Sequence, residues 1–391
     1  AFIQFAGFTV GTAQSFFDFY QSPASSFFAP PSSNTGDRGW KVFAYTVQYG
    51  NGFSATFSFE EPRSFSTVTP QSGTLNTNLG NLVLGVNTSD QDKAKTRFPD
   101  IVQNWRVDQA WGSAQLMVAA HDVSGGYYAA SGAPVGGIAG ATCSTLTAGF
   151  LGLGTGTITG SETCGHPADK VGWAVGGGSR HNFPGGDYFQ WQATYTQGAV
   201  RYVAFTPAGA FSPVMFNGQN FGYGFFSDGI FSNATQDIQL TTVWGINAAY
   251  DHLWLPNFRT SLYGSYFKVD YGANANLAIC NAQSRPFAGL GPAATPSAIG
   301  GSIAFNPVQV VNGACNNNWA FWTIGSRTQY NFTPWFYVGF DVIYQKLETA
   351  SSGANVTYTA LTGTAKPTAI YHIQDQDNYG LRIRVHRDIV P

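Results

Sequence analysis

Alternation of aromatic and hydroxyl side chains over residues 53–59 is the feature that most limits how this chain can fold. The segment reads FSATFSF and follows Asn51-Gly52, a dipeptide typical of tight hairpin turns. A period of two places the aromatic side chains on one face of a β-strand and the hydroxyls on the other. In a water-soluble sheet, a second layer of protein would have to cover the aromatic face. The rest of the sequence decides what covers it.

The same alternation recurs along the whole chain, and no apolar stripe with the period of a helix separates the repeats. It predicts twelve strands, which lie near residues 1–11, 39–49, 52–61, 98–108, 112–122, 168–178, 187–198, 237–253, 257–270, 318–331, 335–347 and 377–388.

The connections between these segments alternate in length. Short turns, such as residues 49–52 and 108–111, alternate with long stretches rich in Gly, Ser, Ala, Pro and Asn. The long stretches cover residues 12–38, 62–97, 123–167, 199–236, 271–317 and 348–376. This order predicts an antiparallel up-and-down meander, since Greek-key crossings would not sort the connections by length.

Composition narrows the environment of this sheet. Only 10% of the residues are Asp, Glu, Lys or Arg, against about 25% in ordinary soluble domains. Aromatic residues reach 16%, yet no run of 18 apolar residues predicts a transmembrane helix. The formal net charge is −2 without a long basic block, which argues against a nucleic-acid partner.

A lipid bilayer is the covering layer that these features favour. The twelve predicted strands have one aromatic-rich face, and the sequence predicts no helices to cover it. Closing the sheet into a barrel pairs every backbone group, as hydrocarbon requires. Aromatic residues such as Trp254 and Trp335 lie beside the short turns, where a barrel meets the membrane interface. We therefore predict an all-β transmembrane barrel. The alternative is a secreted soluble β-rich adhesin.

The four cysteines fall into two local pairs, Cys143 with Cys164 and Cys280 with Cys315. Neither pair has the spacing of a zinc site, and we expect neither a metal nor a cofactor. Two loop-closing disulfides in an oxidising compartment are the favoured interpretation, and four unpaired thiols are the alternative.

Both ends of the chain resemble the outer-membrane porins of alphaproteobacteria. The stretch AFIQFAGFTVGTAQSFFDFY at residues 1–20 is similar to a family strand that leads into a loop folded back inside the barrel. The stretch NYGLRIRVHRDIVP resembles the family's closing strand. The resemblance implies a single barrel domain over residues 1–391 in the outer membrane of a Gram-negative bacterium. It also implies sixteen strands and a homotrimer, so four strands are expected to be missing before Ala1.

The resemblance also places a pore constriction in the loop at residues 12–38. Its aromatic residues would pack the loop against the barrel wall, and Asp18 would supply an acidic group at the narrowest point. A turn-capping role for Asp18 is the alternative. The expected constriction residues are Phe16, Phe17, Asp18, Phe19 and Asp37.

Basic residues on the polar face are expected to line the pore. A charge that faced lipid at mid-depth would cost about 2–4 kcal/mol, so arginines within strands belong inside the barrel. The expected pore-lining residues are Arg106, Lys170, Arg259, Arg327, Arg382 and Arg384. Arg327 has Asp341 on the adjacent strand as an alternative partner. These basic residues outnumber the acidic ones that can be placed, which favours a weak preference for anions.

The predicted function is passive diffusion of small hydrophilic solutes and ions through a water-filled channel. A substrate-specific channel is the nearest alternative, in which Tyr263, Phe267 and Phe321 would form an aromatic track for sugars. No arrangement of Ser, His and acidic residues predicts catalysis, so we expect no enzyme activity.

Overall fold

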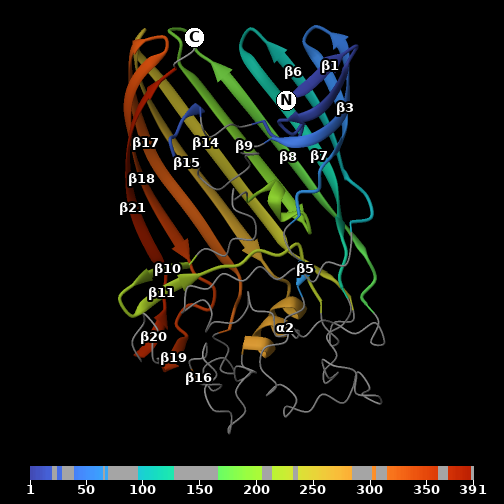
Figure 1. The fold of residues 1–391 in the computed structure, drawn as a ribbon, viewed down its shortest axis with the longest axis vertical. Helices are drawn as coiled ribbons and strands as arrows, with labels where there is room; N and C mark the ends of the chain where they lie inside the picture. Colours follow the sequence, from blue (N-terminus) through green and yellow to red (C-terminus); the bar gives the residue numbers. More distant parts are fainter. Residues whose placement is uncertain are drawn as a thin grey trace.

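Thirteen antiparallel strands form one continuous curved sheet in the computed structural model (Figure 1). The structure describes residues 1–19, 24–28, 39–64, 67–68, 96–126, 166–204, 214–231, 237–283, 302–304, 315–359 and 369–388. Each strand of the sheet pairs with the next one along the chain. The strands are β1 (Phe2–Phe5), β2 (Phe8–Ala13), β3 (Trp40–Gly50), β4 (Phe53–Glu60), β6 (Asp100–Gln109), β7 (Gly112–Val123), β8 (Lys170–Asn182), β9 (Tyr188–Gln197), β14 (Thr242–Leu255), β15 (Phe258–Asp270), β17 (Trp319–Thr333), β18 (Phe336–Glu348) and β21 (Gln376–Arg387).

The predicted up-and-down meander is confirmed, with one difference in the strand count. The segment at residues 1–11 was expected to be a single strand, but it contains β1 and β2 joined by a tight turn. Ala6 and Gly7 both take positive φ angles in this turn. Apolar residues continue on both sides of the turn, so the alternation gave no sign of it.

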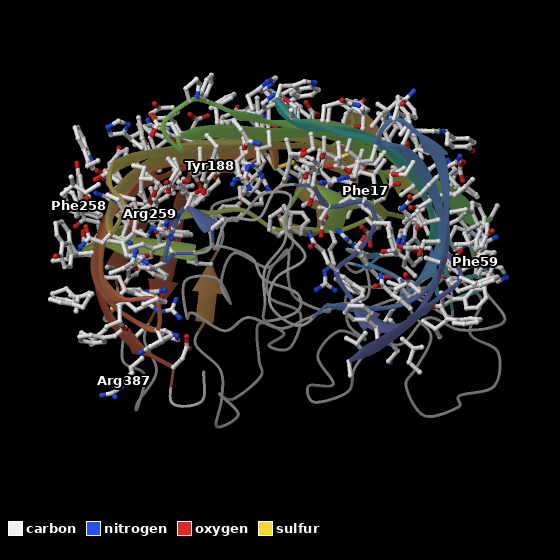
Figure 2. The ribbon with its side chains drawn as sticks, turned by 90° about the horizontal axis from the view of Figure 1, so that it is seen from above. Phe17, Phe59, Tyr188, Phe258, Arg259 and Arg387 are labelled. Carbon is white, nitrogen blue, oxygen red and sulfur yellow. A yellow bond between two sulfur atoms is a disulfide. The ribbon has the colours of Figure 1, made fainter. Side chains whose placement is uncertain are left out.

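The aromatic face of the sheet lies on the outside of its curve. Phe53, Phe57 and Phe59 of β4 are between 40% and 48% exposed, whereas Thr56 and Ser58 are buried. Figure 2 shows Phe59 and Phe258 pointing away from the curved sheet, and Arg259 and Phe17 within the curve. The hydroxyl and amide side chains therefore face the interior, as expected for a membrane barrel.

The two outermost strands of the sheet run in the same direction. Twelve antiparallel pairings separate β1 from β21, so an even number of reversals makes these two strands parallel. They lie at the two ends of the arch in Figure 2. Antiparallel closure would therefore need an odd number of further strands between them.

Elements from the long connections gather at one end of the sheet (Figure 1). These elements are β5 (Thr67–Val68), η4 (Val200–Tyr202), β10 (Val214–Asn217), β11 (Asn220–Tyr223), β12 (Gly229–Ile230), β13 (Gln239–Leu240), α2 (Ala273–Gln283), β16 (Ser302–Ala304), β19 (Asn355–Thr359) and β20 (Ala369–Ile373). In the described part of the chain, no helix is long and apolar enough to cross a membrane.

A hydrophobic core joins these connections to the inner face of β14, β15, β17 and β18. Phe225 and Phe226 from one connection pack against Tyr271, Phe267 and Trp319. We call this core with its supporting connections the cap. Part of the loop end of the sheet is thus covered by a folded structure.

One of the two expected disulfides is confirmed. Cys280, in α2, is bonded to Cys315, which precedes β17. Cys143 and Cys164 lie outside the described residues. The bond closes a loop with a sequence separation of 35 residues and ties the cap to the barrel wall.

Replacement of Cys280 by serine is expected to loosen the cap without unfolding the barrel. Constraint of a loop of this length contributes about 3–4 kcal/mol in the chain-entropy model. Limited proteolysis of the folded protein checks this, since cleavage in the 273–318 region should become faster. Unchanged cleavage in the Cys280→Ser variant would show that the cap does not depend on the disulfide.

Candidate functional site

The segment that follows β2 folds onto the inner face of the sheet. We call residues 14–28 the inward segment, of which 14–19 and 24–28 are described. It leaves the sheet after Ala13 and contacts side chains from strands on both halves of the arch. These contacts form two anchors.

The first anchor is a buried ion pair between Asp18 and Arg63. The Arg63 Nη1 and Nη2 atoms donate hydrogen bonds of 2.9 and 3.0 Å to the two carboxylate oxygens. Both side chains are almost completely buried, and the guanidinium lies over the rings of Trp40 and Tyr202. Phe17, also buried, packs edge-on against Tyr202. The Asp18 carboxylate therefore has a cationic partner and no exposed surface.

A second carboxylate, that of Asp100, binds the backbone of Arg63. Asp100 accepts hydrogen bonds from the Arg63 backbone N–H at 3.0 Å and from the Tyr202 hydroxyl at 2.7 Å. The same carboxylate lies 2.6 Å from Nδ1 of His121. These buried groups connect β6, β7 and η4 to the first anchor.

Polar side chains of the strands hold the backbone around Asp18. Asn104 and Gln115 both donate to the Phe16 carbonyl, at 2.6 and 3.1 Å. Glu60 accepts from the Phe16 N–H at 3.0 Å, and Gln192 accepts from the Phe19 N–H at 2.8 Å. At these positions, inner-face amides of the strands bind the inward segment.

The second anchor centres on Asp341 of β18. Its carboxylate accepts hydrogen bonds from the Ser26 hydroxyl at 2.9 Å and the Phe27 N–H at 2.6 Å. The Tyr263 hydroxyl donates to the other carboxylate oxygen at 2.6 Å. Asp341 is completely buried, so this part of the inward segment rests directly against the wall.

Two inward-facing glycines make room for the rings of the second anchor. A Cβ atom on Gly339 would lie 2.9 Å from the Phe27 ring, and one on Gly380 would lie 3.0 Å from Phe28. Arg327 donates to the Ala24 carbonyl at 2.7 Å, and Ser261 donates to the Ser25 carbonyl at 2.5 Å. Strands β15, β17, β18 and β21 therefore all contribute to this anchor.

The six predicted basic residues take different positions around the inward segment. Arg106 pairs with Asp108 and has its guanidinium carbon 5.3 Å from the ring centre of Phe19. Lys170 pairs with Asp237 at 2.6 Å, at the loop end of β8.

The other four basic residues lie on the half of the arch that carries the second anchor. Arg327 is nearly buried and lies 3.6 Å from Asp251, so its ion-pair partner is Asp251 rather than Asp341. Arg259 lies 3.8 Å from the same carboxylate and is partly exposed. Arg382 donates to the Phe27 carbonyl, and Arg384 lies over the rings of Phe27 and Tyr337.

Arg63 and the residues around Phe27 were missed by the sequence reasoning. Arg63 lies in a long connection outside the strand pattern, where nothing local signals a buried partner. The sequence around Asp341 could have indicated a contact with a loop. The alternation places this carboxylate on the inner face, two residues after Gly339, whose missing side chain leaves room for another group. The predicted constriction residue Asp37 lies outside the described residues.

The expected aromatic track for sugars is wrong. Phe267 and Phe321 belong to the hydrophobic core of the cap, and Tyr263 bonds to Asp341. All three side chains are at most 8% exposed, so none offers a ring face to a passing solute. Among the described residues, no group of three or more His, Cys, Asp or Glu is placed to hold a metal ion.

Comparison with known protein families decides what this architecture is. A family model described as "Porin subfamily" matches residues 1–381. The chain belongs to this porin family. The porin therefore lies in the bacterial outer membrane, with lipid against its aromatic outer face and solute passing on the inner side.

Two solved structures of low sequence identity match the porin, and the first of them shares its fold. The outer membrane channel DcaP of Acinetobacter baumannii matches with a TM-score of 0.50 and 12% identity, over 98% of the porin and 73% of DcaP. OmpT of Vibrio cholerae, an outer membrane protein folded in vitro, matches with a TM-score of 0.43 and 9% identity, over 97% and 75% of the two chains. No curated protein sequence matches this chain.

Proposed function

We propose that this porin is a channel for passive diffusion of small hydrophilic solutes and ions, and that the inward segment forms its narrowest part. The observation that carries the proposal is the span of the inward segment between its two anchors. Phe16 to Phe19 contact β4, β6, β7 and β9, while Ala24 to Phe28 contact β15, β17, β18 and β21. A segment fixed to the inner face at both anchors occupies space inside the curve of the sheet, which narrows the passage.

No chemistry is needed for this function, and we assign no enzyme activity to the porin. Selection rests on the size of the passage and on fixed charges along it. In this proposal Asp18 holds the inward segment in place, and its charge is balanced by Arg63. Phe16, Phe17 and Phe19 contribute packing at the same anchor.

We further propose that additional strands complete the wall between β1 and β21. Three would be an odd number and would give sixteen strands, the count implied by the resemblance to alphaproteobacterial porins. The earlier expectation of four followed from taking residues 1–11 as one strand. A homotrimer is part of the same proposal, because the family resemblance implies it.

Swelling of liposomes that contain the full-length porin tests the proposal. In this assay, uncharged sugars of increasing size should enter at rates that fall steeply with size. Saccharides too large for the pore should not enter, and the rate should not saturate with concentration. Swelling that saturates for one sugar would favour a substrate-specific channel, and no swelling would contradict a channel of either kind.

A further inference from the structure

Charge is distributed unequally between the two halves of the inner wall. On the strands from β8 to β21, the inward-facing charged residues are Lys170, Arg180, Asp251, Arg259, Arg327, Asp341, Arg382 and Arg384, with His386 near the turn end. Six of these are cations and two are carboxylates. Both carboxylates are completely buried, so they are far less accessible to solutes than the arginines.

The carboxylates on this half are also occupied by neighbouring groups. Asp341 accepts hydrogen bonds from the inward segment and from Tyr263. Asp251 lies between Arg259 and Arg327, at 3.8 and 3.6 Å. In the described part of the chain, neither acid lies within ion-pair distance of Arg180 or Arg384, and Lys170 is paired with Asp237 at the far end of its strand.

The other half of the wall carries its acids in a buried cluster. Glu60 and Asp100 are buried against Arg63 and His121, and Asp108 on the inner face pairs with Arg106. The described acids of this half therefore add little negative charge to the passage. Among the described residues, the net charge on the inner face therefore comes from the basic half.

Three arginines of the basic half are available to a solute. Arg180 stacks its guanidinium on Tyr188 at 4.1 Å, and Arg384 lies over Phe27 and Tyr337. Arg259 shares the single Asp251 carboxylate with Arg327, so the two arginines keep a net positive charge, and Arg259 extends into the curve of the sheet (Figure 2). Rings that support the flat face of a guanidinium leave its edges to other partners. In Arg180 the Nε–H donates to Asn182 at 3.1 Å, so its Nη groups are the ones that would bind oxygen atoms of an anion.

The spacing of these arginines indicates separate charges around the wall rather than one tight site. Arg259 and Arg384 share one row of the sheet, linked through Gln329 and Gly339. Three strand spacings separate them, which amounts to about 14 Å. Arg180 lies three strands to the other side of Arg259. The arginines are thus spread around the wall, too far apart for one small anion to contact all three at once, which gives attraction without slow release.

The geometry points to an anion-selective passage in this porin, in which Arg180, Arg259 and Arg384 attract small solutes that bear carboxylate or phosphate groups. This inference rests on the proposed diffusion function and adds the class of solute. Screening by salt limits the reach of each charge to about 10 Å at 0.1 M, so the preference should weaken as the salt concentration rises.

Reversal potentials in planar bilayers test the inference with the full-length porin in a KCl gradient. Wild type should prefer chloride over potassium by about 3- to 10-fold, the ratio expected for a water-filled passage with a few fixed charges. The triple variant R180Q/R259Q/R384Q should bring the ratio close to one. K268Q is the matched control, because Lys268 lies on the same strand as Arg259 but faces outward. It should keep the wild-type ratio.

The outcomes separate this inference from the proposed function. Channel steps with a preference for potassium, or a triple variant with the wild-type ratio, would overturn anion selection while leaving the diffusion channel in place. Absence of steps from folded wild type would overturn both. If the triple variant does not fold, the chloride-to-potassium ratios of wild type and of the single variant R384Q test the inference instead. R384Q should have a lower ratio than wild type. A wild-type ratio at or below one contradicts the inference. In a gradient of potassium acetate in place of KCl, wild type should likewise prefer the anion, here a carboxylate, over potassium.

Discussion

Replacement of Asp341 by alanine is expected to give a larger and noisier single-channel conductance than wild type. The substitution removes the acceptor for the Ser26 hydroxyl, the Phe27 N–H and the Tyr263 hydroxyl. Each donor left buried without a partner costs about 1–3 kcal/mol, so the docked state of the inward segment loses at least about 3 kcal/mol. The segment should then leave the wall and widen the passage intermittently.

Gln345→Ala is the matched control for the Asp341 variant. Gln345 lies on the same strand and the same inner face, four residues closer to the cap. It should leave the conductance unchanged. Wild-type conductance and noise in Asp341→Ala would mean that Asp341 does not hold the constriction.

The Asp18→Asn variant should lose stability while keeping the ion selectivity of wild type. From the sequence alone, Asp18 was expected to supply an acidic group at the narrowest point of the pore. In the structure it is buried and paired with Arg63, so its charge is balanced inside the wall. Breaking a buried pair by removing one partner leaves an uncompensated charge, which costs about 3–5 kcal/mol.

Heat-modified mobility of the folded porin in gels measures this loss as a lower transition temperature. The double variant D18L/R63M provides the control, since replacing both partners of a buried pair by apolar groups is often close to neutral. It should recover most of the lost transition temperature. A clear shift in reversal potential for Asp18→Asn with unchanged stability would contradict the buried ion pair and support an acidic group exposed to the passage.

The faces of the strands could be predicted because their signal is local. In β4 and β9, a period of two fixes which side chains share a face, and the bilayer then determines which face is outside. The β1–β2 turn escaped prediction because Phe5 and Phe8 continue the apolar pattern across it. The dipeptide Ala6-Gly7 was the only sequence signal for this turn, and it predicts a hairpin turn less strongly than Asn51-Gly52 does.

Contacts of the inward segment could not be predicted, because they join distant parts of the chain. Asp341 and Phe27 are separated by 314 residues, and Phe19 and Gln192 by 173. Nothing in the local sequence of either partner specifies the other. The cap was missed for a related reason: its core residues, such as Phe225 and Tyr371, are scattered through connections whose average composition is that of loops.

Planar-bilayer recording of the full-length porin in symmetrical KCl tests the central claim most directly. A constricted diffusion channel should give discrete, long-lived conductance steps that grow in proportion to salt concentration, and Asp341→Ala should enlarge them. A folded sample, judged by its heat-modified mobility, that gives no steps would contradict the account. Steps of equal size and noise in wild type and Asp341→Ala would contradict the constriction by the inward segment.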